Sequence, residues 1–345
     1  MRIGILTHPQ GVNYGGILQC YALCTYLRKN GHDPMVIRRQ DDKAFFLWEW
    51  ARSLLRLLHF PRYYDSNEVD KGKKIRSFID NHLKRTMPIR SQSQMKKVCR
   101  RYQLDAVIVG SDQVWRKDFA IKFGYNYFLD FVPHDVRKLS YAASFGLNEW
   151  QYDEKQNKVL KKLLTRFEGV SVRELEAIGL LKENLGIDAV QQVDPTLLID
   201  VEEYSNIASP RLVEDGYVFV YWLGAKEAVE KKISEIEQKG VNVVKMFLRD
   251  NEEHMSVEDW LSYIKYANQV ITDSFHGCVF SIIFSRPFII RFNNSGGIGR
   301  LSSLFKILNI ENEVSENSPI DYGKVHACIE ELQARSKTFI LSSLK

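Results

Sequence analysis

The sequence lacks several short motifs that identify common classes of enzyme. Its five cysteines form no CxxC pair and are odd in number, so they indicate neither a disulfide framework nor a thiolate metal site. There is no HExxH motif, paired-histidine cluster or Asp-x-Asp sequence, so no metal is expected. GxSxG is absent, which argues against a serine hydrolase. GxGxxG and GxxxxGKS are absent too, so no standard phosphate-binding loop is present.

The N-terminus also lacks a long apolar run. Residues 1–6 hold one positive side chain and a brief apolar run before His8 and Pro9. This run is too short for a signal peptide or a membrane-spanning helix. We therefore expect a cytoplasmic protein whose first strand covers residues 2–6.

Charge is distributed unevenly, although the formal net charge is only +5. Residues 43–101 contain fifteen Lys or Arg against five Asp or Glu, and the rest is mildly acidic. Within residues 43–64, aromatic and leucine side chains are interleaved with Arg52, Arg56 and Arg62, as in helices that lie in an anionic headgroup layer. A helical insertion that packs on its own domain gives the same pattern, and we favour it. No nucleic-acid recognition motif accompanies the charge, so nucleic acid is not expected as a partner.

Strand and helix patterns alternate along the chain, which predicts an α/β fold. A second series of such units begins with the apolar run 217–222, after Ser209 and Pro210. At 345 residues the chain is long enough for two domains. We expect two Rossmann-like, doubly wound domains that face a cleft. The predicted parts are an N-terminal domain over 1–205 with a helical insertion at about 43–103, a C-terminal domain over 206–320, and a helix over 321–345 that packs back on the N-terminal domain.

His276 lies where α/β proteins place their chemistry. Residues 269–272 predict an interior strand, and residues 278–284 predict an apolar helix that begins at Gly277. His276 is therefore expected in a tight turn at the carboxyl end of a strand, the edge that faces the ligand crevice. The helix N-terminus favours anions, and a histidine can give or take a proton near neutral pH. A structural histidine bonded to backbone is the alternative.

Other predicted strand ends carry hydrogen-bonding residues and arginines. An arginine fork suits a carboxylate or a phosphate, so the set is suited to a small anion. Two members have simpler explanations: Arg173 and Glu174 as a surface pair, and the glycine pair as a close turn. The candidate residues are Asn13, Gly15, Gly16, Ser111, Asp112, Ser144, Arg173, Ser274, His276 and Arg291.

Six sequence blocks, taken together and in order, resemble the polysaccharide pyruvyl transferase family. They extend from the first strand toward about residue 305, and leave the basic insertion and the last forty residues unmatched. The resemblance implies two Rossmann-like domains, as in glycosyltransferases of the B type. The blocks are NYGGILQCYAL at 13–23, VGSDQVW at 109–115, SYAASFG at 140–146, SVRE at 171–174, DPTLL at 194–198 and TDSFHG at 272–277.

The resemblance also implies a reaction. The three-carbon unit of phosphoenolpyruvate is transferred to two sugar hydroxyls, which gives a cyclic pyruvate ketal and phosphate. His276 is the expected general acid, which protonates the methylene carbon, and a bound anion favours its imidazolium form. Arg173 is expected to act with it and to hold the donor. Ser274, Gly277 and Arg291 are assigned to the donor side, and the remaining candidates at Asn13, Gly15, Gly16, Ser111, Asp112 and Ser144 to the acceptor or the cleft.

One block departs from the family pattern. Some members carry Arg-Leu-His where this chain has Ser274-Phe275-His276, so an arginine that would hold the donor is missing. Arg291 or Arg300 is expected to replace it.

The expected partners follow from the same resemblance. They are phosphoenolpyruvate as co-substrate, without a further cofactor, and a capsule or exopolysaccharide sugar linked to undecaprenyl diphosphate. The lipid-linked acceptor is motivated by the basic aromatic segment 43–64, which is the candidate for peripheral contact with the inner face of the plasma membrane. Two alternatives stay open: a nucleotide-sugar-dependent glycosyltransferase of the same fold, and a non-catalytic relative that binds carbohydrate or membrane.

Overall fold

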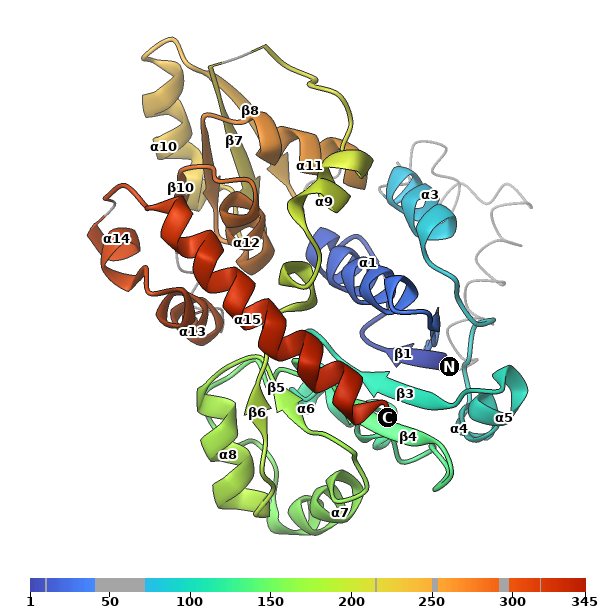
Figure 1. Ribbon diagram of the computed structural model, residues 1–345. Helices are drawn as coiled ribbons and strands as arrows, with labels where there is room; N and C mark the ends of the chain where they lie inside the picture. Colours follow the sequence, from blue (N-terminus) through green and yellow to red (C-terminus); the bar gives the residue numbers. More distant parts are fainter. Residues whose placement is uncertain (10, 41–71, 215, 250–253, 292–297, 317) are drawn as a thin grey trace, which may run out of the picture.

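Two parallel sheets, one in each half of the chain, form the framework of the molecule (Figure 1). The computed structural model describes residues 1–9, 11–40, 72–214, 216–249, 254–291, 298–316 and 318–345. The predicted α/β class is confirmed. The basic aromatic segment 43–64 lies outside the described residues.

The first sheet has the strand order β2-β1-β3-β4. Its centre is buried because β3 consists only of apolar residues, as is usual for a parallel strand covered on both faces. Parallel bridges from Leu139 to Gly169 and from Ala143 to Val172 extend the sheet toward the pair β5-β6. The strands are β1 (Arg2–Leu6), β2 (Asp33–Val36), β3 (Ala106–Val109), β4 (Arg137–Ser140), β5 (Ser171–Val172) and β6 (Val190–Gln191).

The second sheet has the order β10-β9-β7-β8. Its four strands are therefore arranged as in the first sheet. In each sheet, the second strand along the chain pairs with one side of the first strand, and the third strand pairs with its other side. The point where the winding reverses lies between β1 and β3 in one sheet, and between β7 and β9 in the other. The strands are β7 (Tyr217–Trp222), β8 (Asn242–Phe247), β9 (Gln269–Thr272) and β10 (Phe288–Ile290).

Helix α1 (Tyr14–Lys29) connects the two halves. The Asn13 side chain caps its start, and the helix is buried over nearly its whole circumference. It packs against α12 (Phe275–Ile283) and the short turn η2 (Pro195–Leu197). Other helices of this half are α3 (Lys73–His82), α4 (Gln92–Lys96), α5 (Val98–Tyr102), α6 (Lys117–Ala120), η1 (Asn126–Phe128), α7 (Glu154–Leu164), α8 (Glu176–Leu185) and α9 (Val201–Ile207).

Helix α12 (Phe275–Ile283) begins two residues before the expected start at Gly277. The reason is its cap: Ser274 has extended backbone angles, and its Oγ accepts a hydrogen bond from the Gly277 N–H at 3.2 Å. His276 is therefore in the first helical turn and not in a turn before the helix. The neighbouring helices are α10 (Glu227–Glu237), α11 (Val257–Tyr266), α13 (Ile298–Leu308) and α14 (Glu311–Glu316).

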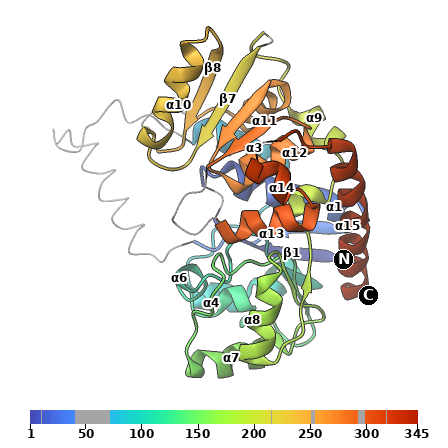
Figure 2. The same ribbon diagram turned by 90° about the vertical axis from the view of Figure 1, so that its left-hand side faces the viewer.

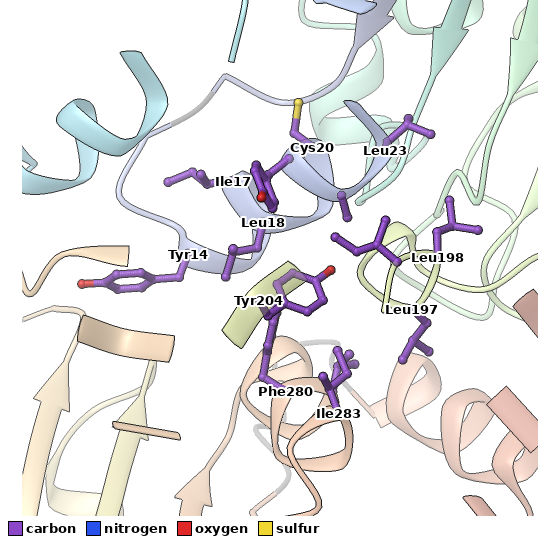
Figure 3. Close-up of a cluster of buried hydrophobic side chains, with 14 of the residues drawn as sticks. Tyr14, Ile17, Leu18, Cys20, Leu23, Leu197, Leu198, Tyr204, Phe280 and Ile283 are labelled. Carbon is purple, nitrogen blue, oxygen red and sulfur yellow. The ribbon is translucent and has the colours of Figure 1, made fainter. Parts of the chain in front are cut away.

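A continuous apolar core joins the two halves (Figure 3). Tyr14 at the start of α1 stacks on Trp260 of α11, with ring centroids 5.3 Å apart, and donates its hydroxyl hydrogen to the Met255 carbonyl at 2.7 Å. Tyr204 of α9 contacts Phe280 of α12 edge to face. Because these rings come from both halves, the contact between the halves is itself apolar core.

Helix α15 (Tyr322–Ser343) crosses the molecule along one side (Figure 2). Near its start, the Tyr322 hydroxyl donates to the Arg286 carbonyl at 2.5 Å. Further along, Ser336 accepts from the Val193 N–H at 3.3 Å and donates to the Gln192 side chain. The helix thus touches both halves. None of the helices in the described ranges combines the length and apolar character needed to cross a bilayer.

Candidate active site

His276 lies where two helices begin. It occupies the first turn of α12, is only 6% exposed, and faces the first turn of α1. A Cβ atom on Gly15 would overlap the imidazole ring, whereas a Cβ on Gly16 would meet Asn13 at an ordinary 3.6 Å. Gly15 therefore makes room for His276, and the positive ends of two helix dipoles meet at this point.

Arg173 and Asp194 form a buried ion pair next to His276. Arg173 follows β5, and its Nη1 lies 2.8 Å from Asp194 Oδ2, while its Nε bonds to Glu174 at 3.1 Å. Asp194 follows β6, and its Oδ1 accepts hydrogen bonds from the N–H and hydroxyl of Thr196. The proposal of a surface pair between Arg173 and Glu174 is wrong, because both side chains are almost fully buried.

Asp194 also faces the histidine. The distance from His276 Nε2 to Asp194 Oδ2 is 3.6 Å, which allows attraction between charges but is too long for a good hydrogen bond. Burial alone would raise the pKa of Asp194, but the His276 imidazole, Arg173 and the Thr196 N–H together hold it well below its usual range. Asp194 is thus a buried anion that lies between Arg173 and His276.

Arg300 brings a second guanidinium into the same cluster. It comes from α13 and lies 5.9 Å from the centre of the Phe275 ring, and Arg173 lies 4.5 Å from that ring. Burial and the like charge of Arg173 lower the pKa of Arg300. Such a pair of neighbouring guanidinium groups favours a bound anion.

Three nitrogen atoms of this cluster are buried without a hydrogen-bond partner in the described part of the chain. They are Arg173 Nη2, His276 Nε2 and Arg300 Nε. Buried donors are nearly always paired in folded proteins, so a ligand that supplies acceptor oxygens is expected between them.

Asp112, which follows a strand of the first sheet, adds a further carboxylate to the cluster. It follows β3 in a left-handed conformation, with φ of 69°, and is buried. Burial alone would raise its pKa, but the nearby charges of His8, Arg173, His276 and Arg300 lower it. Asp112 therefore lies between the strand ends of the two sheets.

Several predicted residues serve the backbone instead of facing the cluster. Asn13 and Ser274 cap α1 and α12. Ser144 accepts from the Gly146 N–H at 3.0 Å. Ser111 differs from these three, because its Oγ donates to the Ala142 carbonyl at 2.9 Å and also lies 3.4 Å from Asp194 Oδ2, within the cluster.

Gly277 packs against β9, and Arg291 lies on the surface. A Cβ on Gly277 would lie 2.5 Å from Thr272 Oγ1, so this glycine permits close helix-to-strand packing. Arg291 is exposed at the end of β10, and its backbone N–H donates to the Thr272 carbonyl at 3.1 Å.

Three site residues were missed by the sequence analysis. Asp194 appeared there only as part of a matched block, and His8 only as the end of the first strand. Asp273 accepts hydrogen bonds from the N–H groups of Leu223 and Gly224, at 2.7 and 2.8 Å, and so bridges β9 to the end of β7. Each of the three residues lies just after a strand, and this position is the signal that could have identified it.

The described residues contain no group of three His, Cys, Asp or Glu side chains arranged to hold a metal ion. A hollow of about 620 Å³ lies elsewhere, between α9, the end of α12 and α15. None of the predicted site residues lines it.

Solved structures resemble this fold at low sequence identity. UDP-GlcNAc 2-epimerase from Neisseria meningitidis, bound to UDP-GlcNAc, is 13% identical with a TM-score of 0.50, over 100% of this chain and 99% of that chain. UGT89C1 from Arabidopsis thaliana, complexed with quercetin, is 12% identical with a TM-score of 0.51, over 99% of both chains. A glycosyltransferase from Rickettsia africae is 9% identical with a TM-score of 0.51, over 99% of this chain and 98% of that chain. These likenesses confirm the predicted glycosyltransferase-B-like fold.

A family model identifies the family of the chain, which the fold alone does not identify. The model described as polysaccharide pyruvyl transferase matches residues 13–295, which is most of the chain. No curated protein of significantly similar sequence is found. The matched range includes Arg173, Asp194 and His276.

Proposed function

Since the chain belongs to the polysaccharide pyruvyl transferase family, we propose that it forms a cyclic pyruvate ketal on a sugar of a capsule or exopolysaccharide precursor. Phosphoenolpyruvate supplies the three-carbon unit, phosphate is released, and no cofactor is required. The observation that carries the proposal is the set of three buried nitrogen atoms on Arg173, His276 and Arg300 that have no partner among the described residues.

The donor anion is proposed to bind between the two arginines. Phosphoenolpyruvate carries a carboxylate and a phosphate, and each can accept two parallel hydrogen bonds from a guanidinium. Arg173 and Arg300 approach the same Phe275 ring, so one small dianion can reach both. In this proposal Arg300, and not the exposed Arg291, replaces the arginine that is missing at Ser274.

His276 is the proposed general acid. It gives a proton to the methylene carbon, and C2 becomes an oxocarbenium-like centre that a sugar hydroxyl attacks. Asp194 is the proposed positioning residue, because its buried carboxylate lies 3.6 Å from Nε2 of the proposed acid. A positioned acid contributes about 10² to 10⁴ in rate.

The acceptor is proposed to enter from the side of the first sheet. Gly15, Gly16, Ser111 and Asp112 lie at that edge, and of these Asp112 carries a charge toward the cluster. The side chains of Asn13 and Ser144 are engaged in a helix cap and a turn, so their proposed contribution is to shape the cleft.

An acceptor linked to undecaprenyl diphosphate would require contact with the inner face of the plasma membrane. The proposed contact is the basic aromatic segment 43–64. Reversing the charges of Arg52, Arg56 and Arg62 should weaken sedimentation with anionic liposomes, and unchanged sedimentation would remove this part of the proposal.

The reaction is tested by incubating the protein with phosphoenolpyruvate and a panel of galactosides, N-acetylhexosamines and lipid-linked sugars. Phosphate release should accompany a product heavier by pyruvate minus water. His276→Gln should abolish both signals, and His134→Gln, which alters an exposed histidine, should change neither. Absence of product across the panel would contradict the proposal.

The donor contacts are tested by a matched pair of arginine variants. Arg300→Met should raise the KM for phosphoenolpyruvate about tenfold or more, because a charge-assisted hydrogen bond contributes about 1.5–3 kcal/mol. Arg291→Met should leave the KM close to that of the wild type. The reverse result would reassign the donor contact to Arg291.

The same protein also tests the two competing functions. A nucleotide-sugar-dependent glycosyltransferase should be stabilised by a uridine or guanosine diphosphate in a thermal-shift measurement, whereas the proposed enzyme should be stabilised by phosphoenolpyruvate. A non-catalytic relative should keep every measured affinity after His276→Ala and Arg173→Ala.

A further inference from the structure

A second histidine lies at the edge of the candidate site, on the opposite sheet from His276. His8 follows β1, and β1 pairs with β3 so that Leu6 lies beside Val109. The next residues stay together, since Thr7 Oγ1 donates to the Ser111 carbonyl at 3.2 Å. His8 and Asp112 therefore flank the point where the winding of the first sheet reverses, which is the place where open α/β sheets bind ligands.

The corresponding point of the second sheet is already filled. There the Asp273 carboxylate bridges the end of β9 to two N–H groups after β7. In the first sheet the Gln19 amide joins the strand ends, since it donates to Thr7 Oγ1 at 3.1 Å and accepts from the Ser111 N–H at 3.2 Å. The Asp112 carboxylate instead accepts from the N–H of its own neighbour Gln113, at 2.8 Å. The carboxylate at the second reversal point is thus used to join two strands, whereas the Asp112 carboxylate at the first is not.

The imidazole of His8 is held by aromatic rings. Its ring centroid lies 5.0 Å from that of Phe119 and 5.5 Å from that of Tyr127, both edge to face. The side chain is partly exposed, but Nε2 is buried and has no hydrogen-bond partner within the described ranges. A fixed ring with an unpartnered nitrogen is suited to receive a hydrogen bond from a ligand.

Asp112 links the two histidines electrostatically. Burial raises the pKa of its carboxylate, and the nearby charges of His8, Arg173, His276 and Arg300 lower it. Arg116 also lies near this group, with its guanidinium 5.5 Å from the centre of the Phe119 ring that contacts His8. One buried carboxylate therefore lies near two histidines that follow strands of opposite sheets.

The proposed reaction, on which this inference rests, has to move two hydroxyl protons. The methylene carbon gains one proton, two sugar hydroxyls lose one each, and the leaving phosphate gains the other. His276 can give the proton that the methylene carbon gains, but it can then accept only one of the two hydroxyl protons. We propose that His8 is the second proton-transfer residue, which accepts the proton of the first sugar hydroxyl while Asp112 orients its ring.

The complete sequence is balanced with two histidines. His276 gives its proton to C3, the first hydroxyl oxygen bonds to C2, and its proton passes to His8. The C2–O bond to phosphate then breaks, with its electron pair on phosphate, and His8 gives that group its proton. The second hydroxyl oxygen bonds to C2, and its proton returns to His276. Both histidines are restored, and the products are the ketal and hydrogen phosphate.

The test is chemical rescue of a histidine variant. His8→Gly should lower kcat about 10²-fold to 10⁴-fold and leave the thermal shift produced by phosphoenolpyruvate unchanged. Added imidazole should restore part of the lost activity, because His8 is partly exposed and its removal leaves a space of that shape. His8→Gln, which fills the space, should be equally slow but should not respond to imidazole. His134→Gly should behave as the wild type with and without imidazole.

The outcomes separate this inference from the proposed function. An inactive wild type overturns the proposed function itself. An active wild type with an equally active His8→Gln overturns the role of His8 alone. Loss of the phosphoenolpyruvate shift in both His8 variants, or slow variants that imidazole does not restore, would make His8 a binding or structural residue and also overturn the inference.

Discussion

Gly15 is the residue whose identity is explained most directly by its neighbour. The His276 imidazole occupies the space where a Cβ would be, whereas Gly16, in the same helical turn, has room for one. We expect Gly15→Ala to displace His276 and lower kcat about 10²-fold, and to destabilise the fold by about 1–3 kcal/mol. Gly16→Ala should keep near-normal kinetics and stability. Steady-state kinetics and denaturant unfolding of the pair check this, and equal losses in both variants would contradict it.

Asp194 balances charge that would otherwise be buried alone. Asp194→Asn leaves Arg173 with one partner fewer, so we expect a loss of about 3–5 kcal/mol in the free energy of unfolding at neutral pH. The exposed carboxylate of Asp188, which pairs with Lys182, offers a control. Asp188→Asn should change stability by less than about 0.5 kcal/mol.

The effect of Asp194 should depend on pH in a defined direction. Its pKa in the folded chain lies well below the unfolded value of about 3.9. Its ionised form therefore stabilises the fold fully above about pH 4, and this stabilisation is lost as the pH falls from there toward the folded pKa. The difference between wild type and Asp194→Asn should shrink in unfolding curves measured below about pH 4. A constant difference would show that charge is not the cause.

At the scale of elements, the start of α12 decides where His276 points. Ser274→Ala removes the cap and should cost about 1 kcal/mol of stability. It should also lower kcat, since the first turn that carries His276 is then less firmly held. Ser274→Thr, which keeps a capping hydroxyl, should restore most of both losses. Thermal unfolding and kinetics are the measurements, and a threonine variant as impaired as the alanine variant would argue against the cap.

Local patterns were sufficient to predict most of the elements. The strands 217–222 and 269–272 coincide with β7 and β9. The first is an unbroken apolar run and the second has two β-branched apolar residues at its centre, and both patterns are typical of buried strands. The start of α12 was misplaced because Ser274 was considered as a donor contact and not as a cap. The residue at which a helix starts depends on the hydrogen bond of its cap, and the periodicity of apolar residues does not indicate that bond.

The candidate site was less predictable because it depends on contacts between distant residues. Arg173 and His276 follow predicted strands, so position alone identified them. Asp194 and Arg300 join them only because β5, β6, α12 and α13 meet in space. Arg300 was foreseen solely as a replacement for a missing arginine, and nothing in the sequence distinguished it from Arg291.

At the scale of the whole molecule, the apolar contact between the halves predicts cooperative unfolding. Trp260 of α11 is fully buried and touches Tyr14 of α1, so each half loses core if the other unfolds. Trp260→Ala should lower stability by about 3–5 kcal/mol and shift one calorimetric transition of the entire chain. Two separate transitions, of which only one moves, would show that the halves unfold independently.

Helix α15 also affects the order in which the chain can fold during synthesis. Val193 and Gln192 of the first half bond to Ser336, and Gly169 packs against Phe339 and Ser343. These partners are made more than a hundred residues later than the strands they complete. The first half therefore emerges from the ribosome with an uncovered flank, which is closed only after the ribosome has passed residue 343.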